Sequence, residues 1–194
     1  LLEVRKLQTI GARASCGRGA RERLALTHGV VRVKTLFTEI LPGNITYTGA
    51  ELTPHWIARR TGVFASSIVA FRGPCAVKTE EMVDMEDRLA NEKILSSEML
   101  HFLGEWFEGT LELAVVRQRL LIASFAEQLR RHLAPSRAAH LYRRGNDLYF
   151  ADPHGENPAK LSVSIVTASP VSSLFHFGVN IDPQGAPVRA VGLR

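Results

Sequence analysis

The last third of the chain is its most constraining feature, because it alternates short runs of β-forming residues with strong turn signals. These runs predict strands over 140–144, 147–151, 160–168 and 173–181. Gly145 and Asn146 form a two-residue connection between the first two runs, which is typical of a β-hairpin. Consecutive strands with connections this short predict antiparallel pairing.

Two amphipathic helices are predicted in the middle of the chain. From Ser97 to Gly109, apolar residues recur at the three- and four-residue spacing of a helix: Met99, Phe102, Leu103, Trp106 and Phe107. Thr110 is a suitable N-cap for a second helix that ends at Pro135. On the first helix, Glu98, His101 and Glu105 would share one face, either as surface ion pairs or, through the last two, as metal ligands.

The region before these helices predicts strands at 34–40 and 44–48, a turn or short helix over 54–62, and a strand at 65–74 closed by Gly73 and Pro74. Strands followed by helices and then by a β meander indicate an α+β fold. We expect a mixed, mostly antiparallel sheet with helices packed on one face.

The positive charge of the chain lies almost entirely at its N-terminal end. The net charge is +5, and residues 1–32 alone hold seven basic and two acidic residues, so 33–194 is neutral. We expect 1–32 to be a basic leader, either disordered or a mis-called start, and 33–194 to be a single α+β domain. A neutral domain argues against nucleic acid as a partner.

Cellular location is predicted from apolar runs and cysteines. No apolar run approaches the ~20 residues that span a bilayer. Cys16 and Cys75 are far apart and suggest neither a disulfide framework nor a metal motif. A cytoplasmic protein without membrane partners is therefore expected.

Four residues of the β region are candidate ligand contacts. Lys160 opens a strand after a polar loop, where a lysine is either a solvated edge charge or a pocket residue. Asn146 and Asp147 suit the hairpin turn, and that role alone can explain them. His176 lies between Phe175 and Phe177, so strand alternation turns it to the opposite face, into solvent or a pocket.

The N-terminal half adds three candidates. Cys75 follows the Gly-Pro pair and is either a reactive thiol, and then the better nucleophile of a covalent mechanism, or a buried inert one. Arg72 and His55 are expected to face the same pocket as ligand-binding residues. Asp84, Glu86 and Asp87 form an acidic cluster that is either a divalent cation site or the start of a helix.

Strings distributed along the body resemble a known prokaryotic family. They are "YTGAELTPHWI", "FRGPCAV", "MVDMED", "SEMLHF", "GNDLYF" and "KLSVSI...SPVSSLFHFGVNI". Residues 33–193 are similar to the domain of unknown function numbered 366, a family from which no established activity carries over. The sequence contains no nucleophile elbow, Walker loop, dinucleotide fingerprint or HExxH motif.

A second, shorter resemblance implies a type of reaction. "NDLYF", "KLSVSI" and "FGVNI" are similar, in order and spacing, to the catalytic half of biotin protein ligases, whose fold is shared with lipoate ligases. The similarity places Asn146, Asp147, Lys160, Gly178 and Asn180 on that pattern. It implies activation of a carboxylate with ATP and magnesium and transfer of the acyl group, with Lys160 holding the acyl phosphate or the carboxylate.

This chain departs from the ligase pattern at three points, of which one is Arg144-Gly145 in place of the Trp-Pro that precedes Asn-Asp in the ligases. Val163 stands where the ligases have a glycine, so if its side chain faces the pocket the ligand is not biotin. The arginine-rich phosphate loop is missing from the body, although "GRGARER" stands upstream in 1–32.

These observations favour a ligase- or acyltransferase-like protein that binds a small carboxylate or acyl ligand. The alternatives are a metal-dependent hydrolase that uses the acidic cluster at 84–87 and a non-catalytic binding protein with the same fold. A small-molecule ligand and a possible homodimer are the expected partners.

Overall fold

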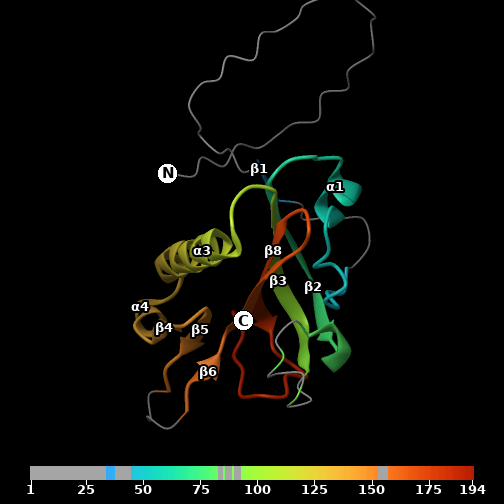
Figure 1. Ribbon diagram of the computed structural model, residues 1–194. Coiled ribbons are helices and arrows are strands. Elements are labelled where there is room, and N and C mark those ends of the chain that lie inside the picture. The colour runs from blue at the N-terminus through green and yellow to red at the C-terminus, as the bar shows by residue number, and fades with distance from the viewer. Residues whose placement is uncertain (1–33, 38–44, 83–84, 86–88, 90–92, 153–156) are drawn as a thin grey trace, which may run out of the picture. The chain divides into compact units, whose positions relative to one another are not determined.

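The computed structural model describes residues 34–37, 45–82, 85, 89, 93–152 and 157–194. Its main element is a five-stranded sheet with the strand order β1-β2-β3-β8-β7 (Figure 1). Strand β1 pairs with β2 in parallel, and every other pair in this sheet is antiparallel. The expected mixed, mostly antiparallel sheet is therefore confirmed. The strands are β1 (Lys34–Phe37), β2 (Ser67–Val77), β3 (Ile94–Trp106), β7 (Ser162–Ala168) and β8 (Ser173–Asp182).

A second, three-stranded sheet has the order β4-β5-β6. It consists of β4 (Leu141–Arg144), β5 (Asp147–Phe150) and β6 (Ala159–Lys160). Gly145 turns the β4–β5 hairpin with a φ of 61°, a left-handed conformation that glycine adopts without steric cost. The hairpin predicted from Gly145 and Asn146 is confirmed.

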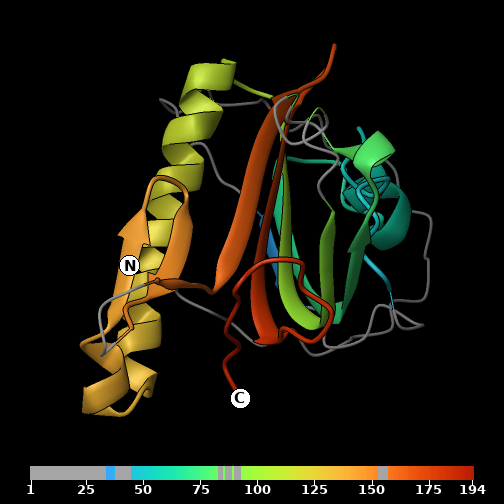
Figure 2. The same ribbon diagram turned by 90° about the horizontal axis from the view of Figure 1, so that it is seen from below.

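Helices lie on both sides of the large sheet. The long helix α3 (Leu111–His132) begins at Thr110, whose Oγ1 accepts a hydrogen bond from the Leu113 N–H at 3.2 Å. Figure 2 shows α3 on one face and the six-residue helix α1 (Trp56–Thr61) on the other. The remaining helical segments are the 3-10 turn η1 (Thr79–Glu81) and α4 (Pro135–Ala138).

Each face of the large sheet has its own apolar core. On the α1 side, Trp56 packs with sheet residues such as Phe71, Met99 and Leu103. On the α3 side, Phe175 and Phe177 of β8 are fully buried against residues that include Ile122 and Leu161. Burying one large apolar side chain stabilises the fold by about 1.5–3 kcal/mol.

The helix predicted from Ser97 to Gly109 is wrong, because these residues form most of β3. The strand lies between β2 and β8 and is covered on both faces, so apolar residues are needed at successive positions. Leu103 joins the core on the α1 side, whereas Phe102 and Trp106 join the core on the α3 side. Such a doubly buried strand imitates the spacing of a helix.

Two predictions near the N-terminus also need correction. The strand predicted at 44–48 is reduced to an isolated bridge between Tyr47 and Cys75. The strand predicted to close at Pro74 instead continues as β2 to Val77, with a register shift between Gly73 and Cys75. A bulge accommodates a proline within a strand because the residue there needs no ladder hydrogen bond.

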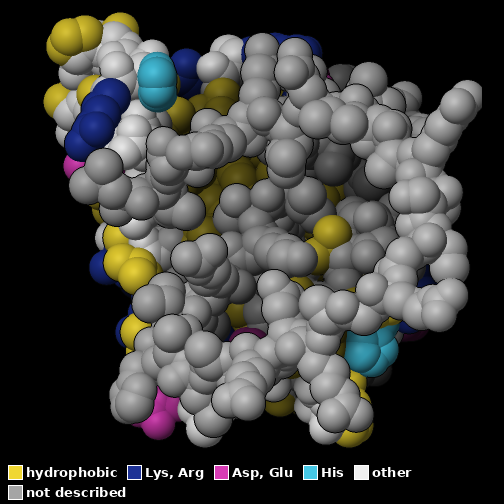
Figure 3. Space-filling model, turned by 90° about the horizontal axis from the view of Figure 1, so that it is seen from above, with side chains coloured by type: hydrophobic (Ala, Val, Ile, Leu, Met, Phe, Trp, Pro, Cys, Tyr) yellow, Lys and Arg dark blue, Asp and Glu magenta, His cyan; other side chains and the backbone are white. Residues whose placement is uncertain are grey.

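The surface carries apolar side chains mixed with charged ones. On α3, Val116 and Leu120 are exposed, and Figure 3 shows hydrophobic and basic side chains side by side along the left edge of its view. Single exposed apolar side chains are normal on soluble surfaces. Within the described residues, no helix has both the length and the apolar character to cross a membrane.

Candidate functional site

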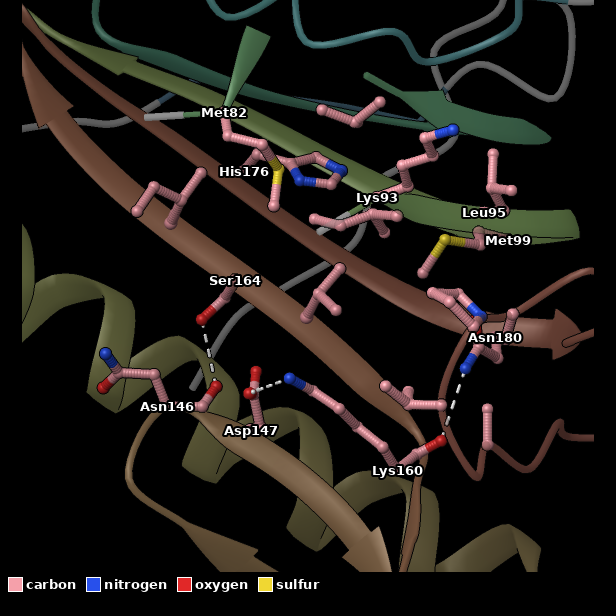
Figure 4. Close-up of a pocket in the computed structure, with 18 of the residues that line it drawn as sticks. Met82, Lys93, Leu95, Met99, Asn146, Asp147, Lys160, Ser164, His176 and Asn180 are labelled. Atoms are coloured by element: carbon pink, nitrogen blue, oxygen red, sulfur yellow. Dashed lines mark hydrogen bonds and ion pairs between the residues drawn. The ribbon is translucent and has the colours of Figure 1, made fainter. Parts of the chain in front are cut away.

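A cavity of about 830 Å³ lies on the α1 side of the large sheet, a size typical of sites for small molecules. Residues of β7 and β8 form part of its wall, and further walls come from β3, the β4–β5 hairpin, the segment around Tyr47 and residues 186–190. Figure 4 shows Lys160 and Asp147 on one wall and His176 and Met82 on the opposite wall. Five candidates from the sequence line this one cavity: Asn146, Asp147, Lys160, His176 and Asn180.

Lys160 is held in the wall through its backbone. Its N–H donates to the Arg189 carbonyl at 3.0 Å, and its own carbonyl accepts from the Val191 N–H at 3.0 Å. The ammonium forms an ion pair with Asp147, with Nζ 2.8 Å from Oδ2, and the lysine side chain is 32% exposed. Asn180 Nδ2 donates to the Lys160 carbonyl at 3.4 Å. The strand-end lysine is thus a fixed pocket charge rather than a freely solvated one.

Asn146 contributes mainly through its backbone. The Ser164 hydroxyl donates to the Asn146 carbonyl at 3.0 Å and accepts from Gln118 Nε2 at 2.9 Å. The Asn146 side-chain oxygen accepts from Arg119 of α3 at 3.2 Å. The turn that carries Asp147 is therefore tied to both α3 and β7.

Among the described residues, the side chains that line the cavity are predominantly basic. Four basic side chains in this part of the chain line it, against the two carboxylates of Glu81 and Asp147. The four are Lys93, Arg144, Lys160 and Arg189. One of the two carboxylates already forms an ion pair with Lys160. An anionic ligand fits this charge distribution better than a cationic one.

The opposite wall contains a buried histidine pair. His176 Nε2 lies 3.1 Å from His101 Nδ1, and His101 Nε2 lies 3.1 Å from the Gly73 carbonyl. The Tyr47 ring stacks on His176 with centroids 3.7 Å apart. Burial lowers the pKa of His101 to about 4 and lowers that of His176 well below its usual range, so both rings are neutral near pH 7.

His176 occupies the face that strand alternation predicts. Phe175 and Phe177 point into the core on the α3 side, whereas His176 lines the cavity on the other side and is 3% exposed. The predicted pocket orientation is therefore confirmed over the solvent-exposed alternative.

Val163 and Gly178 shape the floor between the two polar walls. Val163 lines the cavity, so the substituted glycine position of the ligase pattern does face the pocket. A Cβ on Gly178 would lie 2.8 Å from Met99 Cε and 3.2 Å from His176 Cε1. Only glycine leaves that part of the floor open without displacing a neighbour.

Cys75, Arg72 and His55 are not among the described residues that line the cavity. Burial raises the pKa of the Cys75 thiol to about 12, which disfavours the thiolate that a nucleophile requires. Arg72 is exposed and forms an ion pair with Glu98. The exposed His55 precedes α1 with a φ of 62°, and its ring stacks on Phe107.

Glu105 and His101 have other roles than the predicted helix stripe. The Glu105 carboxylate accepts from the His55 backbone N–H at 2.9 and 3.0 Å and from the Ser172 hydroxyl at 2.7 Å, so it anchors the start of α1. Within the described residues no cluster of three metal-ligating side chains is found. Asp84, Glu86 and Asp87 lie outside the described residues, as does the leader 1–32, so both remain predictions.

The sequence did not indicate Tyr47 as a site residue, and it indicated His101 only as a helix-surface residue or as a metal ligand with Glu105. The position of His101 on the α1 side would have been found if "SEMLHFLGEW" had been interpreted with the two-residue period of a strand, which puts His101 on the same face as Met99 and Leu103. No local signal places Tyr47 against His176, because that contact comes from the single bridge to Cys75.

Comparison with known proteins identifies the family. The domain of unknown function family DUF366 matches residues 36–194. The chain belongs to this family. An uncharacterised protein of Methanocaldococcus jannaschii is 32% identical over 186 residues, which cover 89% of this chain and 79% of that protein.

Two solved structures are similar to this chain. A protein of unknown function from Pyrococcus horikoshi is 38% identical with a TM-score of 0.72, over 84% of this chain and 81% of that one. The biotin protein ligase from Aquifex aeolicus in complex with biotin and ATP is also similar, with 17% identity and a TM-score of 0.46, over 82% of this chain and 59% of that one.

Proposed function

We propose that this DUF366 protein binds a small carboxylate or acyl-type ligand in the cavity, with Lys160 as the residue that holds the carboxylate. The observation that carries the proposal is the convergence of Asn146, Asp147, Lys160 and Asn180 on one cavity wall. They come from the three short strings that resemble the ligase pattern.

The chemistry of Lys160 supports this assignment. An ammonium is a compact charge with three hydrogen-bond donors, which suits it to hold a carboxylate, and Asp147 fixes its position through an ion pair. The predominantly basic lining favours an anion, and the walls near Met99 and Val163 favour an apolar chain behind it. Because Val163 faces the cavity where the ligases have a glycine, we propose a ligand other than biotin.

The sequence resemblance implies ligase- or acyltransferase-type chemistry on that carboxylate, with ATP and magnesium as co-reactants. The described lining fits the carboxylate better than it fits the metal. Magnesium prefers carboxylate oxygens, and the two carboxylates that line the cavity are Glu81 and Asp147, of which Asp147 is paired with Lys160. We therefore restrict the proposal to binding of the carboxylate, and we propose a cytoplasmic location from the two widely separated cysteines.

A thermal-shift screen of the full chain tests this function. The probes are straight-chain carboxylates from acetate to decanoate, the amides of the same chain length, and ATP with magnesium. We expect the medium-length carboxylates to raise Tm more than their amides, because only the carboxylate carries a charge for Lys160. Equal shifts for acids and amides, or no shift with either, would contradict the proposal.

A further inference from the structure

We infer that the wall opposite Lys160 is a hydrogen-bond acceptor site formed by Nδ1 of His176, and that the ligand is a carboxylic acid whose far end carries a hydroxyl or N–H donor. The carboxylate at one end of this ligand rests on the proposed function. The donor at its other end is inferred from the histidine pair alone.

The hydrogen-bond chain fixes where the protons lie. The Gly73 carbonyl can only accept, so His101 donates to it from Nε2. A neutral His101 then has an unprotonated Nδ1, which accepts from the Nε2–H of His176 at 3.1 Å. His176 is neutral as well, so its own Nδ1 carries a lone pair and no proton. We find no hydrogen bond to that atom within the described residues.

The rings are held in this arrangement by packing on both sides. Tyr47 stacks on His176 with an interplanar angle of 12°, and Phe71 stacks on His101 with centroids 4.9 Å apart. His176 is 3% exposed and His101 is fully buried. Because Nε2 is engaged by His101, Nδ1 is the nitrogen that His176 can offer to a ligand.

The length of the floor along β8 bounds the class of ligand. His176 lies four residues from Asn180, whose Nδ2 donates to the Lys160 carbonyl, and four residues span about 13 Å along a strand. Between them, Gly178 leaves the floor open, and Met99 and Val163 supply apolar walls. A molecule that fits has an anionic end, an apolar middle and a donor at the other end.

Calorimetric titration of the full chain tests this inference with matched probes. Octanoate has the carboxylate alone, ω-hydroxyoctanoate has both groups, and 1-octanol has the hydroxyl alone, and the series is repeated with the hexyl and decyl chains. We expect the hydroxy acid to bind about three- to tenfold more tightly than the plain acid of its best length, the usual effect of one hydrogen bond. The His176→Phe variant keeps an aromatic ring but has no acceptor, so its preference for the hydroxy acid over the plain acid should vanish. The control variant His132→Phe changes an exposed histidine and should keep this preference.

Nitrogen NMR of the histidine side chains provides a readout that does not depend on affinity. We expect His176 to be protonated at Nε2 and unprotonated at Nδ1. The His101→Phe variant removes the acceptor of the Nε2 proton, so His176 should no longer be fixed in this tautomer. The hydroxy acid should shift the Nδ1 resonance and the plain acid should not.

The possible results separate the two proposals. Equal binding of plain and hydroxy acids, or a His176 protonated at Nδ1, overturns the inference, and loss of acid binding in Lys160→Met would still sustain the proposed function. If 1-octanol binds as tightly as the hydroxy acid and both depend on His176, the carboxylate proposal fails and only the acceptor role of His176 stands. No binding of any probe overturns both.

Discussion

Lowering the pH from about 7.5 to about 4 should destabilise the protein through its buried histidine pair. In the folded chain, burial holds the pKa of His101 at about 4 and that of His176 well below its usual value of 6.5. Unfolding returns both side chains to water, where they take up protons below about pH 6.5. The unfolded state therefore binds more protons than the folded state between these values, and stability falls as the pH falls through this window.

The size of this destabilisation follows from the pKa shift of His101. A change from 6.5 to about 4 for His101 corresponds to a loss of about 3 kcal/mol in the free energy of unfolding, at about 1.4 kcal/mol per pKa unit. His176 acts in the same direction. A loss of this size is a substantial fraction of the total stability of a domain, which is typically about 5–15 kcal/mol.

Urea denaturation at several pH values, followed by fluorescence of the buried Trp56 and Trp106, measures this effect. His101→Gln removes the ionisable group but keeps a donor and an acceptor, so the slope of stability against pH between about 6.5 and 4 should decrease in this variant. His132→Gln, at an exposed position, should leave the slope of the natural protein unchanged. The reasoning is refuted if the natural protein and His101→Gln lose stability equally over this range.

Three further predictions concern the core, the floor and the thiol. Phe177→Ala should lower the free energy of unfolding by about 3–5 kcal/mol in urea, because this ring is fully buried on the α3 side, and a loss below 1 kcal/mol would contradict that packing. Gly178→Ala should weaken octanoate binding about tenfold by calorimetry, since its methyl group would lie 2.8 Å from Met99 Cε; unchanged affinity would place the ligand elsewhere. Cys75 should resist maleimide labelling in the folded protein near pH 8 and should react after unfolding, as measured by peptide mass spectrometry. Rapid labelling of Cys75 in the folded chain would contradict the buried thiol. The Cys75→Ala variant should bind octanoate within about twofold of the affinity of the natural protein.

The C-terminal strands could be predicted from the sequence because their information is local. The turn at Gly145 fixes the β4–β5 hairpin, and the alternation around His176 fixes its face on β8. The second predicted helix agrees with α3 for the same reason, since Thr110 caps it and its apolar stripe has helical spacing. The helix predicted at 97–109 failed because burial of β3 on both faces depends on its neighbours in the sheet.

The site was predictable on the Lys160 wall of the cavity, and on the opposite wall only for His176. Asp147, Lys160 and Asn180 lie on β5, β6 and β8, which all belong to the last third of the chain, and local signals there predict each strand. The direction of Cys75 follows a register shift in β2 between Gly73 and Cys75, which the sequence does not announce. The contact between His101 and His176 spans 75 residues and could be seen only after β3 was recognised as the partner of β8.

The central claim is that Lys160 holds the carboxylate of a ligand. The most direct test is calorimetric titration with octanoate of three proteins: the natural protein, Lys160→Met and Lys78→Met. Methionine keeps the length of the side chain without its charge, and Lys78 is an exposed lysine that is not among the cavity-lining residues. The account predicts that Lys160→Met binds octanoate at least about tenfold more weakly and that Lys78→Met binds it like the natural protein. Equal affinity of all three proteins would contradict it.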